Sequence, residues 1–350
     1  MLLDAEGVSL AQSGDTVLSR LSGSLAAHTA PETHAAVLEL VSSIHQDAPG
    51  TVAELSRLRS RLSAELGEMG LRPASAGTYP LLGPGRMRIS GSERCGVVAD
   101  SMRSLARREP TLALHVHVGV PDPEDALRVL MRLREAVPLL LALSANSPYS
   151  QGHDSGFASA RTVIFQGFPR TGSPRRFGSY GEYVEAVDSL IASGAVPDPS
   201  FLWWDVRLQP SLGTVEVRVM DAQSTIVESA ALVAFVQSLA RLELEGDEPV
   251  DASGPEVLAE NRFLAARDGI QARLIDRAGG RLVPVRRLVQ ELAGRSRPHA
   301  AALGCEKELD QLERLLAANG ADRQRAEAGR TGLGGLVTTL CDRFTTERSD

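Results

Sequence analysis

Apolar residues recur along the chain with two different spacings, and each spacing predicts one type of element. Helical spacing predicts helices over 16–70, 93–108, a segment near 180–193, 224–246 and 255–345. In the first of these, the periodic apolar positions are Val52, Leu55, Leu58, Leu62 and Leu66, and Gly70 fits a C-cap. The Gly- and Pro-rich residues 71–85 predict a loop.

A further helix is predicted within residues 121–148, with Asp122 as N-cap and Pro123 at the first helical position. Its interior proline, Pro138, predicts a break or a kink. The polar residues 145–161 then form a long loop, and loops of this length are usually functional or disordered. After that loop, 162–168 (TVIFQGF) resembles a strand.

Alternation with a period of two predicts a strand within 112–122, LALHVHVGVPD. His115 and His117 share one face of this strand, and aliphatic residues occupy the other. Two imidazoles on one face are costly to bury unless they bind something. The pattern therefore raises the question of what these histidines face.

Two more alternating segments, 202–210 and 214–222, flank a short Gly-containing turn and predict a hairpin. Their polar faces carry Asp205 and Arg207 on the first strand, and Glu216 and Arg218 on the second. If all three strands share one sheet, these side chains and the two histidines line a single groove above an apolar core.

Together these elements predict an α+β fold, in which an antiparallel sheet lines an active-site groove and helices cover it. We expect a single domain over 1–350, with a sheet-containing core in 1–246 and a helical C-terminal subdomain in 255–345. Residues 247–255 are expected to link the two parts.

Composition narrows the function classes. The net charge of −7 argues against a nucleic-acid partner, which would require a basic face. The longest apolar run, 136–145, is about half of a membrane span, and the first ten residues lack the basic region of a signal peptide. Cys95, Cys305 and Cys341 show neither metal-site nor disulfide spacing. These features predict a soluble cytoplasmic protein without a membrane partner.

Carboxylates, imidazoles and guanidiniums on one face are the groups that a magnesium–phosphate site requires, since Mg²⁺ takes oxygen ligands and Arg grips phosphate. Arg161 and Arg170 flank the long loop and could add to this set. Two alternatives stay open from the residues alone. Each polar strand face could simply be solvated, and His115 with His117 could belong to a zinc hydrolase, although they supply only part of a zinc ligand set.

Several segments in order resemble the carboxylate–amine ligase family, also called glutamate–cysteine ligase type 2. They are HVHVGV (115–120), LLLALSANSPYSQGHDSGFASAR (139–161), FPRTGSPRRF (168–177), WWDVRLQPSLGTVEVRVMDAQ (203–223) and NRFLAARDG (261–269), with ASAGTYP (74–80). The resemblance implies a glutamine synthetase-like fold. It also implies an ATP- and Mg²⁺-dependent ligase that joins glutamate to cysteine or another amine through an acyl phosphate, with weak activity, and a possible homodimer.

The resemblance also implies roles for residues. It assigns His115 and Glu216 as metal ligands, and Arg218 and Arg161 as contacts to phosphate or to a substrate carboxylate. His117, Asp205, Arg207 and Arg170 are expected to bind substrate or nucleotide.

Two departures from the family pattern bear on activity. Relatives begin with a Gly-Val-Glu-Glu-Glu strand before the segment that resembles MLLDAEG, and they show a carboxylate where this chain has His45 after Ile44. Only Glu216 is retained in this interpretation, although Asp47 is near. The alternative function is therefore a catalytically degenerate relative that binds nucleotide or a partner without turnover.

Overall fold

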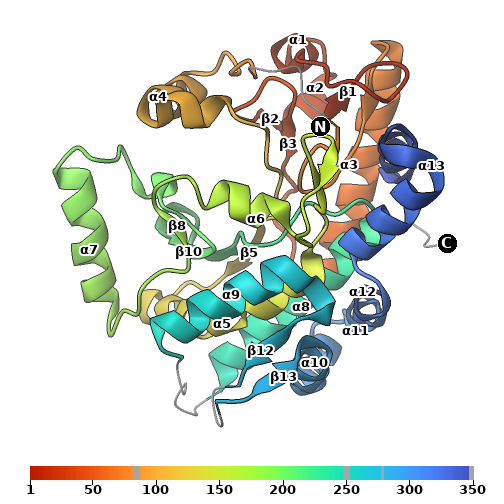
Figure 1. Ribbon diagram of the computed structural model, residues 1–350. Helices are drawn as coiled ribbons and strands as arrows, with labels where there is room; N and C mark the ends of the chain where they lie inside the picture. Colours follow the sequence, from red (N-terminus) through yellow and green to blue (C-terminus); the bar gives the residue numbers. More distant parts are fainter. Residues whose placement is uncertain (82–86, 247–252, 277–279, 347–350) are drawn as a thin grey trace.

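The three alternating segments do form one antiparallel sheet. In the computed structural model (Figure 1), β10 (Val206–Gln209) pairs with β11 (Thr214–Val217), and β11 pairs with β5 (Val116–Gly119). The structure describes residues 1–81, 87–246, 253–276 and 280–346. The predicted linker 247–255 and the end of the predicted loop 71–85 lie largely or partly outside the described residues. The predicted α+β class, with its antiparallel sheet and covering helices, is confirmed.

The apolar face of the sheet packs against two long helices, α5 (Pro123–Ser144) and α8 (Ile226–Glu245). The strand residues Val206, Val215 and Val217 are each at most 1% exposed in this core. Burial of such side chains contributes about 1.5–3 kcal/mol each. This one-sided packing leaves the alternate residues of the three strands on the opposite face.

Of the break or kink predicted at Pro138, the break does not occur, because α5 continues through this residue to Ser144, and the kink stays a prediction. The helix begins as predicted, with the Asp122 carboxylate accepting a hydrogen bond from the Asp125 backbone at 2.9 Å. An interior proline costs about 3 kcal/mol. Val137 and Leu141 beside it are fully buried, so the packing of α5 in the core offsets that cost.

The prediction of one helical stretch over 16–70 is correct only for its second half, α3 (Ala48–Glu68), where Gly70 follows with φ +70°. The first half contains two short helices, α1 (Gly14–Leu18) and α2 (Gly23–Ala26), and a hairpin of β2 (Thr29–Pro31) and β3 (Leu38–Leu40). Pro31 disfavours a continuous helix there, and Leu38 and Leu40 alternate around Glu39.

The predicted strand at 162–168 is also wrong, since α6 (Ala160–Phe165) is a helix. Its N-cap Ser159 accepts a hydrogen bond from the Thr162 backbone, and this capping outweighs the β-branched run that suggested a strand. The preceding loop contains a two-residue pair of strands, β6 (Tyr149–Ser150) and β7 (His153–Asp154).

The region 255–345 is mostly helical, as predicted, but it also contains the hairpin of β12 (Arg273–Ile275) and β13 (Leu282–Pro284). Its helices are α9 (Pro255–Asp268), α10 (Val285–Ala302), α11 (Glu306–Asp310), α12 (Leu312–Ala317) and α13 (Gly320–Arg343). Residues from α9, α10, α11 and α12 join the same core as the sheet. The C-terminal part is therefore packed onto the sheet-bearing part.

The remaining elements complete the chain. They are β1 (Leu2–Leu3), β4 (Arg72–Pro73), α4 (Glu93–Met102), η1 (Arg103–Arg107), β8 (Thr171–Gly172), α7 (Tyr180–Ala192), η2 (Pro199–Phe201), β9 (Trp203–Trp204), η3 (Pro210–Leu212) and η4 (Gly269–Gln271). The helices predicted at 93–108 and near 180–193 are confirmed by α4 with η1 and by α7. Among the described residues, none of the helices is long and apolar enough to cross a membrane.

Candidate functional site

A row of polar side chains crosses the face of the sheet that lies opposite α5 and α8. The strand register places Arg207 opposite Glu216, and Glu216 opposite His117. Glu216 is 1% exposed, and its Oε2 accepts hydrogen bonds from Arg207 Nε at 2.6 Å and from Gln209 Nε2 at 3.3 Å. The sequence prediction that these side chains share a face is correct.

Arg218 and His115 extend the row beyond the ends of the strands. Arg218 Nη1 donates to Glu216 Oε1, and it lies 3.4 Å from His115 Nδ1. Glu216 Oε1 is also 3.6 Å from His115 Nδ1 and 3.5 Å from His117 Nε2. We call these five residues, His115, His117, Arg207, Glu216 and Arg218, the polar cluster.

The cluster fixes the charge state of two of its members. Burial alone would raise the pKa of Glu216, but the hydrogen bond with His117 and the charge of Arg218 outweigh it and hold this pKa far below its usual range. Burial and then the charge of Arg218 lower the pKa of His115 well below its usual value. At neutral pH, Glu216 is therefore an anion and His115 a neutral imidazole.

A second carboxylate, Glu39 on β3, interacts electrostatically with the cluster, and the sequence prediction missed it. Loss of hydration, followed by repulsion from Glu32, raises the pKa of Glu39 on β3, while the nearby charge of Arg218 opposes this shift. Glu216 and His117 also act on Glu39 electrostatically. The alternation of Leu38, Glu39 and Leu40 was the available signal, and the prediction of a helix over this region hid it.

Asp205 lies beside the sheet but is not part of the polar cluster. Its carboxylate accepts two hydrogen bonds from Arg262 of α9, at 2.6 Å from Nε and 3.1 Å from Nη2. Its backbone carbonyl accepts from the amides of Arg218 and Val219. Asp205 therefore connects α9 to the segment that carries Arg218. Beyond the NRFLAARDG resemblance, no sequence signal pointed to its partner Arg262.

Arg161 is buried under the end of β11 and holds its backbone. Its Nη1 donates to the Val219 carbonyl at 2.9 Å and its Nη2 to the Arg218 carbonyl at 3.1 Å. Nε has no hydrogen-bond partner among the described residues. The structure thus brings Arg161 next to the backbone of Arg218, while its predicted contact with phosphate stays a prediction.

The long loop 145–161 is fastened by one buried carboxylate, Asp221, which is 0% exposed. Its oxygens accept hydrogen bonds from Asn146 N at 2.8 Å, Ser147 Oγ at 2.6 Å and Ser159 Oγ at 2.9 Å. Arg161 Nη1 lies 3.6 Å away. The loop is therefore ordered by hydrogen bonds to a residue four positions after the end of β11, and the sequence prediction did not single out Asp221.

Two glycines permit this close packing. A Cβ at Gly77 would lie 2.7 Å from Asp221 Cγ, and a Cβ at Gly320 would lie 2.1 Å from Asn146 Oδ1. Gln324 of α13 also donates to Asn146 Oδ1 at 2.8 Å. We call Asp221, Asn146, Ser147, Ser159 and Gln324 the Asp221 hub.

Two other sequence-predicted positions lie apart from the polar cluster. Arg170 donates from Nε to the Phe201 carbonyl at 3.0 Å and lies over the ring of Trp203. His45 Nε2 is 2.8 Å from Glu54 Oε2 on α3. The carboxylate partner of His45 is therefore Glu54. The carboxylate that interacts electrostatically with the polar cluster is Glu39.

The described residues contain no group of three or more His, Cys, Asp or Glu side chains arranged to hold a metal ion. A catalytic zinc site takes three protein ligands, and these residues offer no such set for the zinc alternative. Mg²⁺ commonly uses only one or two carboxylates, with water and substrate phosphates completing its shell. The ionised Glu216 and the neutral His115, whose Nδ1 lies 3.6 Å from Glu216 Oε1, are the groups present for a site of this open type.

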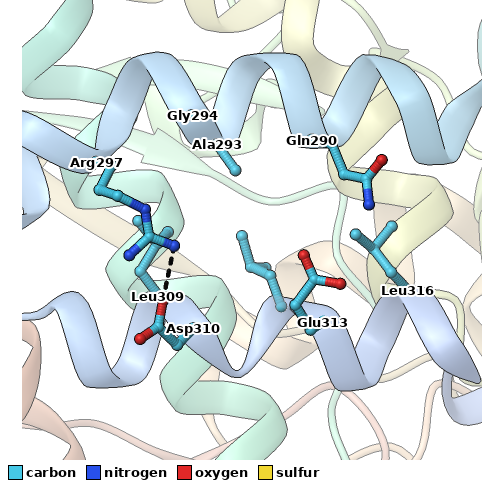
Figure 2. A pocket seen from close by; sticks show the side chains of 9 residues that line it. Gln290, Ala293, Gly294, Arg297, Leu309, Asp310, Glu313 and Leu316 are labelled. Atoms are coloured by element: carbon cyan, nitrogen blue, oxygen red, sulfur yellow. Dashed lines mark hydrogen bonds and ion pairs between the residues drawn. The ribbon is translucent and has the colours of Figure 1, made fainter.

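Two cavities lie elsewhere. The smaller, of about 120 Å³, lies between α10 and the α11–α12 segment, where Arg297 forms an ion pair with Asp310 at 2.7 Å (Figure 2). The larger, of about 760 Å³, lies between α3, α8 and the α11–α12 segment. Neither contains a residue of the polar cluster in its lining.

Comparison with known proteins identifies the family of this chain. The model of glutamate-cysteine ligase family 2 (GCS2) matches residues 2–336. Two proteins of Rubrobacter xylanophilus are similar over 95% of this chain, "Putative glutamate--cysteine ligase 2-1" at 38% identity over 89% of its length and "Putative glutamate--cysteine ligase 2-3" at 42% over 91%. A relative of the same type from Gloeobacter violaceus is 36% identical over 84% of this chain and 80% of its own.

These matches place the chain in a class of ligases, and it belongs to glutamate–cysteine ligase family 2. The family resemblance found in the sequence is confirmed. The fold is also that of a solved glutamate–cysteine ligase of Francisella tularensis, crystallised in complex with AMP. Their similarity has a TM-score of 0.67 at 13% identity, over 99% of this chain and 86% of the other.

Proposed function

We propose that the protein is an ATP-dependent carboxylate–amine ligase that joins the γ-carboxylate of glutamate to the amine of cysteine, with weak activity. ATP transfers its γ-phosphoryl group to the carboxylate, which gives ADP and an acyl phosphate. The amine then attacks the acyl carbon, phosphate leaves, and the amine nitrogen loses a proton as the amide forms. Glutamate and cysteine come to this proposal from the names of the relatives.

One observation supports this function above the others: the polar cluster holds two guanidiniums on a single ionised carboxylate, Glu216. Phosphoryl transfer is mainly a matter of positioning and charge neutralisation, so preorganised cations beside the reacting oxygens supply most of the catalysis. Arg218 can serve this purpose because its Nε has no partner among the described residues.

In this proposal the contacts of each residue indicate its role. Arg207, which also donates to the carbonyls of Ser200 at 2.7 Å and Leu202 at 2.8 Å, fixes Glu216 in place. Arg218 turns its unused donors toward phosphate oxygens when ATP binds. His117, whose side chain is 35% exposed, lines the substrate path.

Glu216 and His115 would hold Mg²⁺ together with the phosphates of ATP. The ion would supply charge neutralisation at the phosphate oxygens during transfer. In this proposal Arg161 and Asp205 position Arg218, because both form hydrogen bonds with its backbone.

The test is release of ADP and phosphate that requires glutamate, cysteine and Mg²⁺ together. We expect Arg218→Lys to lower kcat at least about tenfold, because Lys cannot form the bidentate contact of Arg. Arg61→Lys, in an exposed arginine of α3 outside the polar cluster, is the matched control and should retain most activity. Tight ATP binding without turnover under any amine tested would exclude the ligase and leave the degenerate alternative.

A further inference from the structure

The cavity of about 760 Å³ forms a groove with a helical floor and two helical walls. The first turns of α8 lie at its base, α3 forms one wall, and α11 and α12 form the other. Its lining residues are Pro49, Val52, Ala53, Ser56, Arg57, Ile226, Val227, Ala230, Lys307, Glu308, Gln311 and Arg314. None of them belongs to the polar cluster or to the three-stranded sheet, so this groove is independent of the proposed ligase site.

The floor of the groove is apolar. Ile226 and Ala230 of α8 are buried there, and Val52 of α3 is half-buried beside them. A cavity of a few hundred Å³ with an apolar base and a few polar groups is typical of a small-molecule site. The body of a ligand for this groove is therefore apolar or aromatic.

Three cations stand on the two walls. Arg57 is on the α3 wall, and Lys307 and Arg314 are on the opposite wall. Within the described part of the chain, none of the three side chains has a hydrogen bond or an ion pair. The lining contains only one acidic residue, Glu308, so the groove is cationic in a chain whose net charge is −7. Unpaired cations facing each other across a groove favour a ligand that carries more than one negative charge.

Glu308 adds a different requirement. Its Oε2 is buried and has no donor among the described residues. A buried acceptor without a partner is costly, and a ligand that brings an N–H or O–H donor removes that cost. The occupant therefore combines negative charge, an apolar face and a hydrogen-bond donor.

We propose that this groove binds a nucleoside phosphate at a site separate from the polar cluster. Phosphate oxygens would accept from Arg57, Lys307 and Arg314, since guanidiniums bind phosphate in pairs of hydrogen bonds. The base would lie on the apolar floor, and a ribose hydroxyl or an exocyclic amine would donate to Glu308. A base and ribose with their phosphates meet all three requirements within the volume of the groove.

The chain offers a specific probe of this site, because Lys307 is its only lysine. Reductive methylation with ¹³C-formaldehyde keeps the charge of Lys307 and gives it an NMR signal, and Lys307→Arg identifies that signal by its loss. We expect ATP and ADP to shift the Lys307 signal in a saturable way. Arg57→Ala and Arg314→Ala should each weaken that binding at least about tenfold. Arg61→Ala, four residues along α3 and outside the lining, is the matched control and should leave it unchanged.

Three results would contradict the proposal. No shift with ATP, even where ATP turnover or calorimetric binding is measured, would place all nucleotide binding at the polar cluster and leave the proposed function intact. Inorganic triphosphate binding as tightly as ATP would exclude a role for the base and ribose. An oligoglutamate peptide binding more tightly than any nucleotide would identify the groove as a docking site for acidic protein segments. Conversely, a shift without turnover supports the groove and counts against the ligase.

Discussion

Glu216 shows how one buried carboxylate can organise several cations. Arg207 and Arg218 both donate to it, and it is 1% exposed. Removing one partner of a buried ionic group leaves the others without compensation, and this typically costs about 3–5 kcal/mol.

The first prediction concerns this residue. Glu216→Gln should lower the free energy of unfolding by about 3 kcal/mol, because Arg207 and Arg218 lose their common anion. Urea denaturation at pH 7 measures the change. Glu39→Gln is the matched control: its raised pKa means that ionisation of Glu39 is disfavoured, so this variant should be as stable as the wild type or slightly more stable. Equal losses in the two variants would contradict the special position of Glu216.

Among the site residues, alternation in the sequence was enough to place Arg207, Glu216 and His117 on one face, since strand geometry alone decides this. It could not show that Asp205 is paired with Arg262, because 57 residues separate the two in the chain. Glu39 was missed for a different reason. Its neighbours include several apolar residues at helical spacing, and the alternation of Leu38, Glu39 and Leu40 spans only three residues, too few to outweigh that spacing.

At the scale of elements, the helix predicted with an N-cap signal at Asp122 formed where expected. Asp122 begins α5, and Thr225 with Glu228 forms a capping box at the start of α8. The errors at Pro138 and at 162–168 arose where tertiary packing or a cap outweighed local preference. The β12–β13 hairpin lies within a region whose apolar spacing is mostly helical, so the sequence pattern did not distinguish the hairpin from the helices around it.

The second prediction concerns how α9 is fastened to the sheet. Arg262→Lys should lower the free energy of unfolding by about 1–2 kcal/mol, because Lys cannot make both hydrogen bonds to Asp205. Arg267→Lys, on the same helix but exposed and paired with its neighbour Asp268, should change stability by less than about 0.5 kcal/mol. Thermal or urea unfolding of the two variants separates these outcomes, and a larger loss in the second would refute the connection.

The third prediction concerns Glu54, which joins α3 to the segment that carries His45. Burial would raise the pKa of Glu54, but hydrogen bonds from His45 and from Ser43 outweigh it and lower this pKa to about 2. Since the folded-state pKa is below the unfolded value, Glu54 stabilises the fold above about pH 4.5 and loses this effect as the pH falls toward 2. Glu54→Gln should therefore cost about 1 kcal/mol at pH 7.

The same variant should differ less and less from the wild type as the pH falls below 4.5. Urea midpoints of both proteins between pH 7 and pH 3.5 measure this convergence. A constant difference over the whole range would show that the carboxylate charge has no part in the stabilisation.

On the scale of the whole molecule, a single hydrophobic core contains residues of the sheet, of α5 and α8, and of the C-terminal helices. The three cysteines are all buried and unpaired. Burial raises the pKa of Cys341 to about 11, so only about one thiol in a thousand is ionised at pH 8.

The fourth prediction follows from this burial. In the native protein at pH 8, the three thiols should react with an aromatic disulfide reagent at least about a hundredfold more slowly than in denaturant, because the thiolate is the reactive form. Absorbance of the released thiolate measures both rates. Rapid reaction of one equivalent before unfolding would show that at least one of these cysteines is accessible.

The Asp221 hub has a consequence for the order of folding events. Its partners Asn146, Ser147 and Gln324 come from segments of the chain about 75 to 180 residues apart, according to the hydrogen bonds that join them. Such hydrogen bonds can form only after long loops have closed, at a cost in chain entropy. We therefore expect the Asp221 hub to form late in folding. Ser147→Ala should therefore speed unfolding while leaving the refolding rate almost unchanged. The loop beside the polar cluster would then be the first part to come apart when the protein unfolds.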